Sequence, residues 1–350
     1  MSLAGQSVGT GAELQHLLGQ RLGPYNSFNP VNRAQIWQWC SAMGDGSPLY
    51  LDEGYQARVG LGDPGAVAPP AMMQMWTMRD VDDNYAPGST RAHPYPAMQA
   101  LEQLGFQANV AVSYDLQFHR YLREGDRVHH YKTVVEISAL KRTALGEGYF
   151  FTDRMEYLDQ NDELFAEALI TYFQYCPAAD NAQAGAQSGV APPAAGCEEG
   201  EADEEGAASP GSDLKMAQLQ IGQQLPRLVI PITHKLIVAG ALASQDFIPV
   251  HHNLPAAQAA GMPDIFMNIL TSCGLAARYL TDWAGPGSRL RRLQFRLLAP
   301  NLPGDSMSLQ GELVGLEATG AGDEACVEFA GVNSRGPHLS GRATLALASN

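Results

Sequence analysis

The loop SQDFIPVHHN, residues 244–253, is the most informative stretch of the sequence, because the first half of the chain carries a similar loop, MGDGSPLY, at residues 43–50. In both loops an aspartate is followed three residues later by a proline. Each loop also follows an apolar segment with helical periodicity, at residues 233–243 and 32–42. This shared order predicts two copies of one fold within the 350-residue chain.

The segments beyond each loop repeat the same order of elements. Helical patterns are expected at 71–78 and 95–104 in the first half and at 264–283 in the second. Strand-like segments rich in β-branched and aromatic residues then close each half, at 110–121, 127–140 and 149–157, and at 291–298, 306–316, 325–332 and 341–348. One apolar helix followed by several antiparallel strands predicts an α+β fold in which a sheet wraps a helix.

The stretch 177–212, rich in Ala, Gly, Pro, Glu and Ser, separates the two halves. It has too few apolar residues to offset the entropy lost on ordering, so it is interpreted as a flexible linker. The predicted domains are therefore 1–176 and 213–350. Six of the 37 acidic residues lie at 198–205 inside the linker, where a run of charge is expected to solvate the chain.

The composition excludes several classes of function. A net charge of −15 without a large basic cluster argues against a nucleic-acid partner. No apolar run is long enough for a membrane span, and the first residues lack the pattern of a secretory signal. The five cysteines are scattered without CxxC spacing, so neither a metal site nor a disulfide framework is expected. A reducing, cytoplasmic location fits this usage.

In the second loop, Asp246, Pro249 and His251 follow the pattern D-x-x-P-x-H. This pattern resembles the signature of the MaoC-like (R)-enoyl-CoA hydratases, G-D-x-N-P-[LIV]-H, with Gln245 and Ile248 replacing the usual Gly and Asn. The resemblance implies that each half is a hot-dog domain, a long central helix wrapped by a curved antiparallel sheet. It also implies that the two domains pack as a pseudo-dimer.

Asp246 and His251 suit the chemistry of such an enzyme. Adding water across an α,β-unsaturated thioester needs a base for the water and an acid for the α-carbon, and an Asp and a His can share these roles through one water. The ordinary pKa of histidine, near 6.5, suits proton exchange at neutral pH. An isolated Asp and His at this spacing would be read as a turn cap and a loop histidine, but the flanking helices and the duplication favour catalysis.

The resemblance also implies a backbone N–H at the start of the central helix that stabilises the thioester enolate. The corresponding positions are Asn268, in place of the family's glycine, and Met267, in place of its histidine. A backbone donor does not depend on its side chain, so both remain candidates.

The first-half loop carries Tyr50 where the histidine is expected. A phenol with a pKa near 10 does not replace a histidine base at neutral pH. The first half is therefore predicted to keep the fold without the chemistry, with Asp45 as a turn or cap residue.

Two longer strings resemble the two-subunit MaoC-like hydratases of steroid side-chain catabolism. VAPPAMMQMWTM, residues 67–78, is similar to one subunit, and DIFMNILT, residues 264–271, with YLTDWAGP, residues 279–286, to the other, catalytic one. The resemblance implies a natural fusion of both subunits, acting on the CoA thioester of an unsaturated steroid side chain without a further cofactor. It favours a homodimer, and any contact with an aldolase or thiolase-like enzyme would use a separate protein.

Several residues are candidates for binding the substrate. Arg289, Arg291 and Arg292 can contact CoA phosphates, although alternating arginines on a strand also mark a solvated face. Trp76 can line a steroid-sized apolar cavity or belong to the core, and His252 and Asn253 adjoin the catalytic loop.

Other activities stay open at this point. A hot-dog acyl-CoA thioesterase is the alternative enzyme, although thioesterases usually carry an acidic residue on the central helix. A hydratase of ordinary fatty enoyl-CoA and a non-enzymatic acyl-CoA-binding protein are the other candidates.

Overall fold

A computed structural model of the chain describes residues 11–59, 66–143, 145–177, 212–320 and 322–348. The predicted linker therefore lies outside the described residues except at its two ends. Its first residue, Pro177, is the last residue of a strand.

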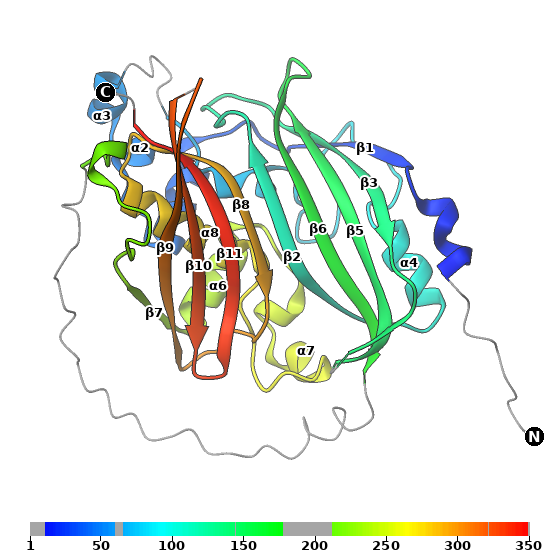
Figure 1. The fold of residues 1–350 in the computed structure, drawn as a ribbon. Helices are drawn as coiled ribbons and strands as arrows, with labels where there is room; N and C mark the ends of the chain where they lie inside the picture. The colour runs from blue at the N-terminus through cyan, green and yellow to red at the C-terminus, as the bar shows by residue number, and fades with distance from the viewer. Residues whose placement is uncertain (1–10, 60–65, 144, 178–211, 321, 349–350) are drawn as a thin grey trace, which may run out of the picture.

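The strands of both halves form one antiparallel sheet, shown in Figure 1. Its order is β1-β3-β5-β6-β2-β8-β11-β10-β9-β7, with the short β4 paired to β5. The first half supplies β1 (Arg21–Asn26), β2 (Ala108–Phe118), β3 (His129–Ile137), β4 (Lys141–Arg142), β5 (Gly146–Leu158) and β6 (Leu164–Pro177). The second supplies β7 (Leu228–Ile232), β8 (Arg289–Leu297), β9 (Asp305–Thr319), β10 (Gly322–Asn333) and β11 (Gly336–Ala346).

The two halves meet where β2 pairs with β8, with Tyr114 opposite Phe295 in the register. Each half is thus a curved sheet, and the two sheets continue one another edge to edge (Figure 1). This is the side-by-side arrangement expected of a pseudo-dimer.

The helices pack against one face of this sheet, with α6 and α8 behind the second-half strands in Figure 1. The longer ones are α1 (Arg33–Met43), α4 (Pro96–Gln103), α6 (His234–Ala243) and α8 (Ile269–Ala284). The shorter ones are α2 (Pro48–Leu51), α3 (Glu53–Arg58), α7 (Leu254–Ala259) and the 3-10 turns η1 (Gly11–Leu17), η2 (Pro70–Met72), η3 (Met75–Thr77), η4 (Met216–Gln218) and η5 (Pro249–His251). Helix α1 packs on α6, so the two equivalent helices meet at the centre of the molecule.

Helix α8 is the central helix of the second half, and its sequence accounts for its bounds. Asn268 caps its start by accepting a hydrogen bond from the Thr271 N–H, and Gly285, with φ 91°, ends it. Nearly all of its residues are buried, as expected for a helix enclosed by a sheet.

The first half differs from its predicted form because it has no continuous central helix. Residues 71–78, predicted as helical, form the 3-10 turns η2 and η3, and an irregular stretch precedes α4. Proline explains part of the break, because Pro87 and Pro94 prevent a helix from running through this segment into α4. The predicted helix at 95–104 is confirmed as α4.

The predicted strands are confirmed with bounds shifted by a few residues, but β1, β4, β6 and β7 were not predicted. Strand β6 begins LFAEALIT, where Ala and Glu weaken the strand pattern although the segment is central in the sheet. Its place in the sheet is decided by pairing with two strands. β5 precedes it across a turn, and β2 lies about 50 residues earlier in the sequence.

Candidate active site

The second loop holds Asp246 in a backbone turn that directly follows α6. The helix ends at Ser244, the Asp246 N–H donates to the Ala241 carbonyl at 2.9 Å, and Gln245 between them has φ 55°. This left-handed conformation favours glycine, which is the family's usual residue at the Gln245 position. Asp246, which this turn places beside the end of α6, is 6% exposed.

His251 lies one short turn later, in η5, with its ring fixed on both sides. Its Nδ1 lies 2.7 Å from the Phe266 carbonyl oxygen, which can only accept a proton, so Nδ1 carries the hydrogen in the neutral ring. The Phe266 ring also contacts the imidazole edge to face, with 5.0 Å between ring centroids. The other nitrogen, Nε2, therefore presents its lone pair, and it lies 3.7 Å from Asp246 Oδ2.

Asn268, the cap of α8, orients the carboxylate. Its side-chain nitrogen donates to Asp246 Oδ2 at 2.9 Å and to Ser244 Oγ at 2.9 Å, while its oxygen accepts from the Thr271 N–H. The other oxygen of the acid, Asp246 Oδ1, is buried and has no hydrogen-bond partner among the described residues. One oxygen of the carboxylate is thus held by Asn268, and the other has no partner among the described residues.

A second layer of hydrogen bonds holds the start of α8. The Ser272 hydroxyl lies 3.2 Å from the Asn268 carbonyl oxygen and 2.9 Å from His338 Nε2, and His338 Nδ1 lies 2.7 Å from the Ala299 carbonyl oxygen. Burial lowers the pKa of His338, so this ring is neutral at physiological pH. A neutral ring that donates through Nδ1 accepts through Nε2, which fixes the orientation of the Ser272 hydroxyl.

The two candidate backbone donors at this helix end differ. The Met267 N–H donates to the Asn301 carbonyl at 3.1 Å, so it is already used. The Asn268 N–H has no acceptor among the described residues, and it lies at the N-terminus of α8, where the helix dipole favours negative charge. Of the two predicted oxyanion donors, Asn268 is the one that geometry leaves available.

The matching loop of the first half keeps the backbone path without the acid–base pair. Asp45 is also 6% exposed, but its Oδ1 accepts from the Ser47 N–H at 3.0 Å, as a turn residue does. Burial raises the pKa of Asp45 to about 6. Tyr50 is buried, and burial raises the pKa of its phenol well above its ordinary value. This loop therefore contains no group suited to accept a proton from water at the position of His251.

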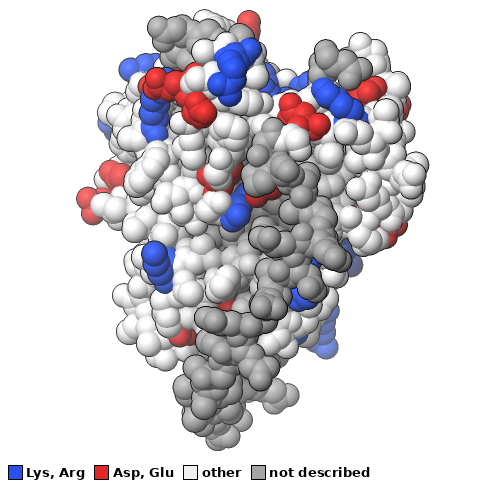
Figure 2. All heavy atoms as spheres, turned by 90° about the vertical axis from the view of Figure 1, so that its left-hand side faces the viewer, with Lys and Arg blue, Asp and Glu red and all other residues white. Residues whose placement is uncertain are grey.

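The predicted phosphate-binding arginines are each already engaged. Arg292 is paired with Asp115 through two contacts of 2.9 and 2.7 Å on the outer face of the sheet. Arg289 donates to the Pro286 and Ser288 carbonyls, and Arg291 to the His119 carbonyl. Figure 2 shows basic and acidic side chains interspersed on one face of the molecule rather than gathered into a basic patch.

The other predicted substrate-binding residues lie in three different settings. Asn253 caps α7 by accepting from the Ala256 N–H, and the exposed His252 lies 3.1 Å from the Phe247 carbonyl oxygen. Trp76 is buried in the first half, in η3, and its Nε1 has no hydrogen-bond partner among the described residues. The structure thus brings together Asp246, His251 and Asn268, with His252 and Asn253 directly behind them in sequence.

The sequence did not predict that the Asn268 side chain would contact Asp246, nor that Ser244, Ser272 and His338 would support this contact. An Asn directly before an apolar helix is a recognisable cap, so the first of these had a signal. The contact between Ser272 and His338 joins residues 66 positions apart, and neither residue has a distinctive neighbourhood in the sequence.

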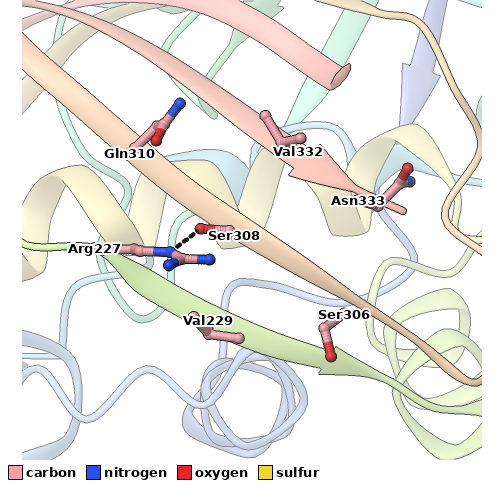
Figure 3. Close-up of a pocket in the computed structure, with 7 residues that line it drawn as sticks. All are labelled: Arg227, Val229, Ser306, Ser308, Gln310, Val332 and Asn333. Carbon is pink, nitrogen blue, oxygen red and sulfur yellow. Dashed lines mark hydrogen bonds between the residues drawn. The ribbon is translucent and has the colours of Figure 1, made fainter. Parts of the chain in front are cut away.

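A separate hollow of about 480 Å³ lies on the outer face of the sheet, between β7, β9 and β10 (Figure 3). Ser306, Ser308 and Gln310 point into it from alternate positions of β9, whose intervening residues face α8. Arg227 supplies its one charged group and contacts Ser308. The hollow contains no acid–base pair and lies on the face of the sheet opposite the helices.

Within the described residues, no three His, Cys, Asp or Glu side chains are grouped so as to hold a metal ion. None of the helices seen there combines the length and the apolar character that crossing a membrane requires.

Comparison with protein-family models assigns each half separately. Residues 17–168 match a model described as the FAS1-like dehydratase domain region, and residues 217–330 match the MaoC-like domain. The match to the second model includes the loop with Asp246 and His251 and the start of α8.

Curated relatives include both subunits of one enzyme. The chain is 38% identical over 128 residues to the "3-oxo-4,17-pregnadiene-20-carboxyl-CoA hydratase beta subunit" of Mycobacterium tuberculosis, covering 36% of the chain and 95% of that subunit. It is 33% identical over 161 residues to the alpha subunit of the same enzyme, and 40% identical over 161 residues to a "Probable enoyl-CoA hydratase alpha subunit" of Thermomonospora curvata. Each of these two matches covers 44% of the chain and 48% of the relative, so the chain spans about half the length of the alpha subunits. One polypeptide thus resembles both subunits, as the sequence predicted for a fusion.

Solved structures confirm the fold. A "MaoC-like dehydratase" superposes with a TM-score of 0.70 at 19% identity, covering 96% of this chain and all of the other. A Mycobacterium tuberculosis protein described as having a double hotdog fold superposes with a TM-score of 0.61 at 16% identity, covering 97% of this chain and 98% of its own. The predicted α+β architecture of two hot-dog domains is therefore confirmed.

Proposed function

The chain belongs to the MaoC-like dehydratase family, and from that membership we propose that it is an enoyl-CoA hydratase with Asp246 and His251 as its acid–base pair. One observation carries the proposal: three suitable groups meet at the start of α8. These are the unpartnered Asp246 Oδ1, the lone pair of His251 Nε2 and the unpartnered Asn268 N–H.

Each group has one role in the proposed reaction. A water held between Asp246 Oδ1 and His251 Nε2 gives a proton to the pair while its oxygen bonds to the β-carbon of the thioester. The negative charge that develops on the thioester oxygen is stabilised by the Asn268 N–H at the helix N-terminus. The pair then returns a proton to the α-carbon, so the product is the 3-hydroxyacyl thioester and the protein is regenerated.

The proposed substrate is the CoA thioester of a bulky, steroid-type unsaturated side chain. Support comes from the names of both Mycobacterium tuberculosis relatives, which are subunits of one hydratase of a 3-oxo-pregnadiene carboxyl-CoA. The first half also replaces the central helix with two short turns, η2 and η3, and irregular chain. A hot-dog domain whose central helix is broken is suited to a substrate larger than a linear acyl chain.

The thioesterase alternative has less support. Within α8 the sole acidic residue is Asp282, near the C-terminal end of the helix, where it pairs with Arg278 at 3.1 Å. The acid of this site instead precedes the helix, as hydration requires in the mechanism above.

The test is a hydration assay with two substrates, crotonyl-CoA and the enoyl-CoA of a steroid side chain. Loss of the conjugated double bond is followed by absorbance, and release of free CoA is followed in parallel with a thiol reagent. Hydration without CoA release is expected, with the higher kcat/KM for the steroid substrate. Release of CoA from saturated and unsaturated thioesters alike would show a thioesterase instead.

A pair of histidine variants tests the assignment of the base. His251→Ala is expected to lower kcat by about 10²- to 10⁴-fold, the usual contribution of a positioned acid or base. His234→Gln is the matched control, because His234 is exposed at the start of α6 and pairs with Asp264. Near-full activity in the His251 variant would contradict the mechanism.

The proposed assembly is a homodimer of the fused chain, with no cofactor other than the CoA of the substrate. Light scattering on the purified protein measures the mass and distinguishes a monomer from a dimer. Any downstream aldolase or thiolase-like partner would be a separate protein, detectable by co-purification with a defined candidate.

A further inference from the structure

The interior of the first half contains a buried ion pair that the proposed mechanism does not use. Lys132 on β3 and Asp153 on β5 are 2% and 0% exposed, and Nζ lies 2.8 Å from Asp153 Oδ2. The contact lacks the alignment of a hydrogen bond, and neither Nζ nor either oxygen of Asp153 has another partner among the described residues. Buried charges are ordinarily satisfied by hydrogen bonds as well as by each other, so this pair has unused donors and acceptors.

Aromatic rings enclose the pair and separate it from solvent. The Lys132 ammonium lies 3.2 Å from the centroid of the Tyr95 ring and 5.8 Å from that of Tyr172. Tyr95 is only partly buried, and it ends the irregular stretch that replaces the central helix. The partly buried Tyr95 ring therefore lies between the ion pair and the surface.

A row of residues paired across neighbouring strands connects the ion pair with the second half. Across the sheet, Asp153 is opposite Ile170, Ile170 is opposite Tyr114, and Tyr114 is opposite Phe295 of β8. The Tyr114 and Phe295 rings are in contact, with 6.2 Å between their centroids. Two strand spacings, about 10 Å, separate Asp153 from Tyr114. That span is comparable to a fused ring system.

The interior of the first half contains further buried polar groups besides the ion pair. Tyr114, Tyr157 and Tyr172 all face inward and are buried, and Tyr114 donates to Gln74 of the broken helix segment. Trp76 adds a buried Nε1 without a partner among the described residues. A structural core has no need of these groups, since apolar residues of similar volume usually stabilise at least as well.

We infer that Lys132 and Asp153 form a recognition site for an uncharged oxygen substituent, a ketone or hydroxyl, at the end of the acyl group farthest from the thioester. The inference rests on the proposed function. The Lys132 ammonium donates to the oxygen, and Asp153 accepts from a hydroxyl. Because the pair has no net charge, it fits a neutral polar group; an anionic substituent would meet the Asp153 carboxylate.

The test compares two enoyl-CoA thioesters of the same steroid acid, one with a ketone on the far ring and one without it. For the unmodified protein, kcat/KM is expected to be about 10- to 100-fold higher for the ketone, the range of one hydrogen bond to a charged group. The double variant Lys132→Met with Asp153→Leu removes both charges together, so no lone charge stays buried. Its ketone preference is expected to fall to about one.

A matched control lies on the outer face of β5 and its neighbour β6. Arg154→Met with Glu167→Gln removes the exposed pair between β5 and β6, and it should leave the ketone preference intact. If the double variant does not fold, as judged by circular dichroism, the single variant Lys132→Met replaces it and should lower the preference several-fold, because the donor to the ketone is lost.

The outcomes separate this inference from the function on which it rests. Hydration of both steroid substrates with equal kcat/KM by the unmodified protein would overturn the inference and leave the hydratase intact. If the double variant Lys132→Met with Asp153→Leu folds and keeps the full ketone preference, the inference is likewise overturned, and the ion pair has a structural role. Absence of hydration with any enoyl-CoA, crotonyl-CoA included, would overturn the proposed function itself.

Discussion

The loops at 43–50 and 244–253 take the same backbone path and reach different chemistry. Each follows a helix, turns through a left-handed residue, Gly44 with φ 65° or Gln245 with φ 55°, and buries an aspartate to the same degree. Asp45 then bonds within its own loop, whereas Asp246 is held by Asn268 from another element. The path of the loop belongs to the fold, and the chemistry comes from what the rest of the half brings to it.

The interiors of the two halves differ in the same sense. In the second half, the continuous helix α8 lies against inward residues of the sheet that are largely apolar, such as Leu293, Met307 and Leu313. In the first half, the helix is broken, and the inward residues include a buried ion pair and several tyrosines. The second half therefore supports a continuous helix with mainly apolar contacts, whereas the first half places polar groups in its interior.

The largest expected effect is the difference in kcat between variants of the two aspartates. Asp246→Asn should lower kcat for enoyl-CoA hydration by about 10²- to 10⁴-fold, because the amide keeps the shape and loses the proton acceptor. Asp45→Asn should change kcat by less than about threefold. Steady-state kinetics on both variants, with thermal unfolding to show that each is folded, makes the comparison. Equal losses would mean that both loops serve catalysis.

The sequence predicted the candidate pair, Asp246 and His251, because both residues lie within one loop whose pattern is distinctive, and the structure places their side chains 3.7 Å apart. It predicted the duplication from the order of elements, and most strands from their β-branched and aromatic residues. It did not predict the break in the first-half helix, because Met72, Met75 and Trp76 are apolar at a helical spacing although Pro87 and Pro94 prevent a helix that runs on to α4. Nor did it predict the contact of Lys132 with Asp153, since that pairing depends on the register of β3 and β5.

The pH dependence of stability distinguishes the loops further. Burial raises the pKa of Asp45 to about 6, whereas an unfolded chain has its ordinary value near 4. The folded state therefore binds this proton more tightly, so the contribution of Asp45 to stability is present below pH 4 and is lost as the pH rises through 6. Asp45→Asn cannot ionise and escapes this loss.

The measurement is urea unfolding of the unmodified protein and of Asp45→Asn at several pH values. Between pH 4 and pH 7 the free energy of unfolding of the variant should gain on that of the unmodified protein by up to about 3 kcal/mol, from two pKa units at about 1.4 kcal/mol each. A difference that stays constant with pH would contradict the assigned ionisation of Asp45.

The two asparagine caps offer the next comparison. Asn32 caps α1 and Asn268 caps α8, each by accepting a backbone hydrogen bond three residues on. Replacing either by Ala should lower the free energy of unfolding by about 1 kcal/mol. Only Asn268→Ala should also lower kcat, by about 10- to 100-fold, because Asp246 then loses the group that orients it.

The readout that separates these roles is the ratio of kcat loss to stability loss. For Asn268→Ala, kcat should fall with little change in KM, since the substrate's binding contacts are not removed. If Asn32→Ala lowered kcat as much, the effect would come from helix packing between the halves rather than from orientation of the carboxylate.

The smallest effect concerns the left-handed residue of each loop. A side chain costs about 1–2 kcal/mol in this conformation, so Gln245→Gly should stabilise the protein by about 1 kcal/mol. Gly44→Ala should destabilise it by a similar amount or more, because the added Cβ would also lie 2.7 Å from Arg278 Nη1. Thermal unfolding of both variants tests the pair. If Gln245→Gly is more stable but hydrates the enoyl-CoA more slowly, the strained backbone of Gln245 helps to position Asp246. Loss of stability in that variant would show instead that the Gln245 side chain makes contacts worth more than the strain it imposes.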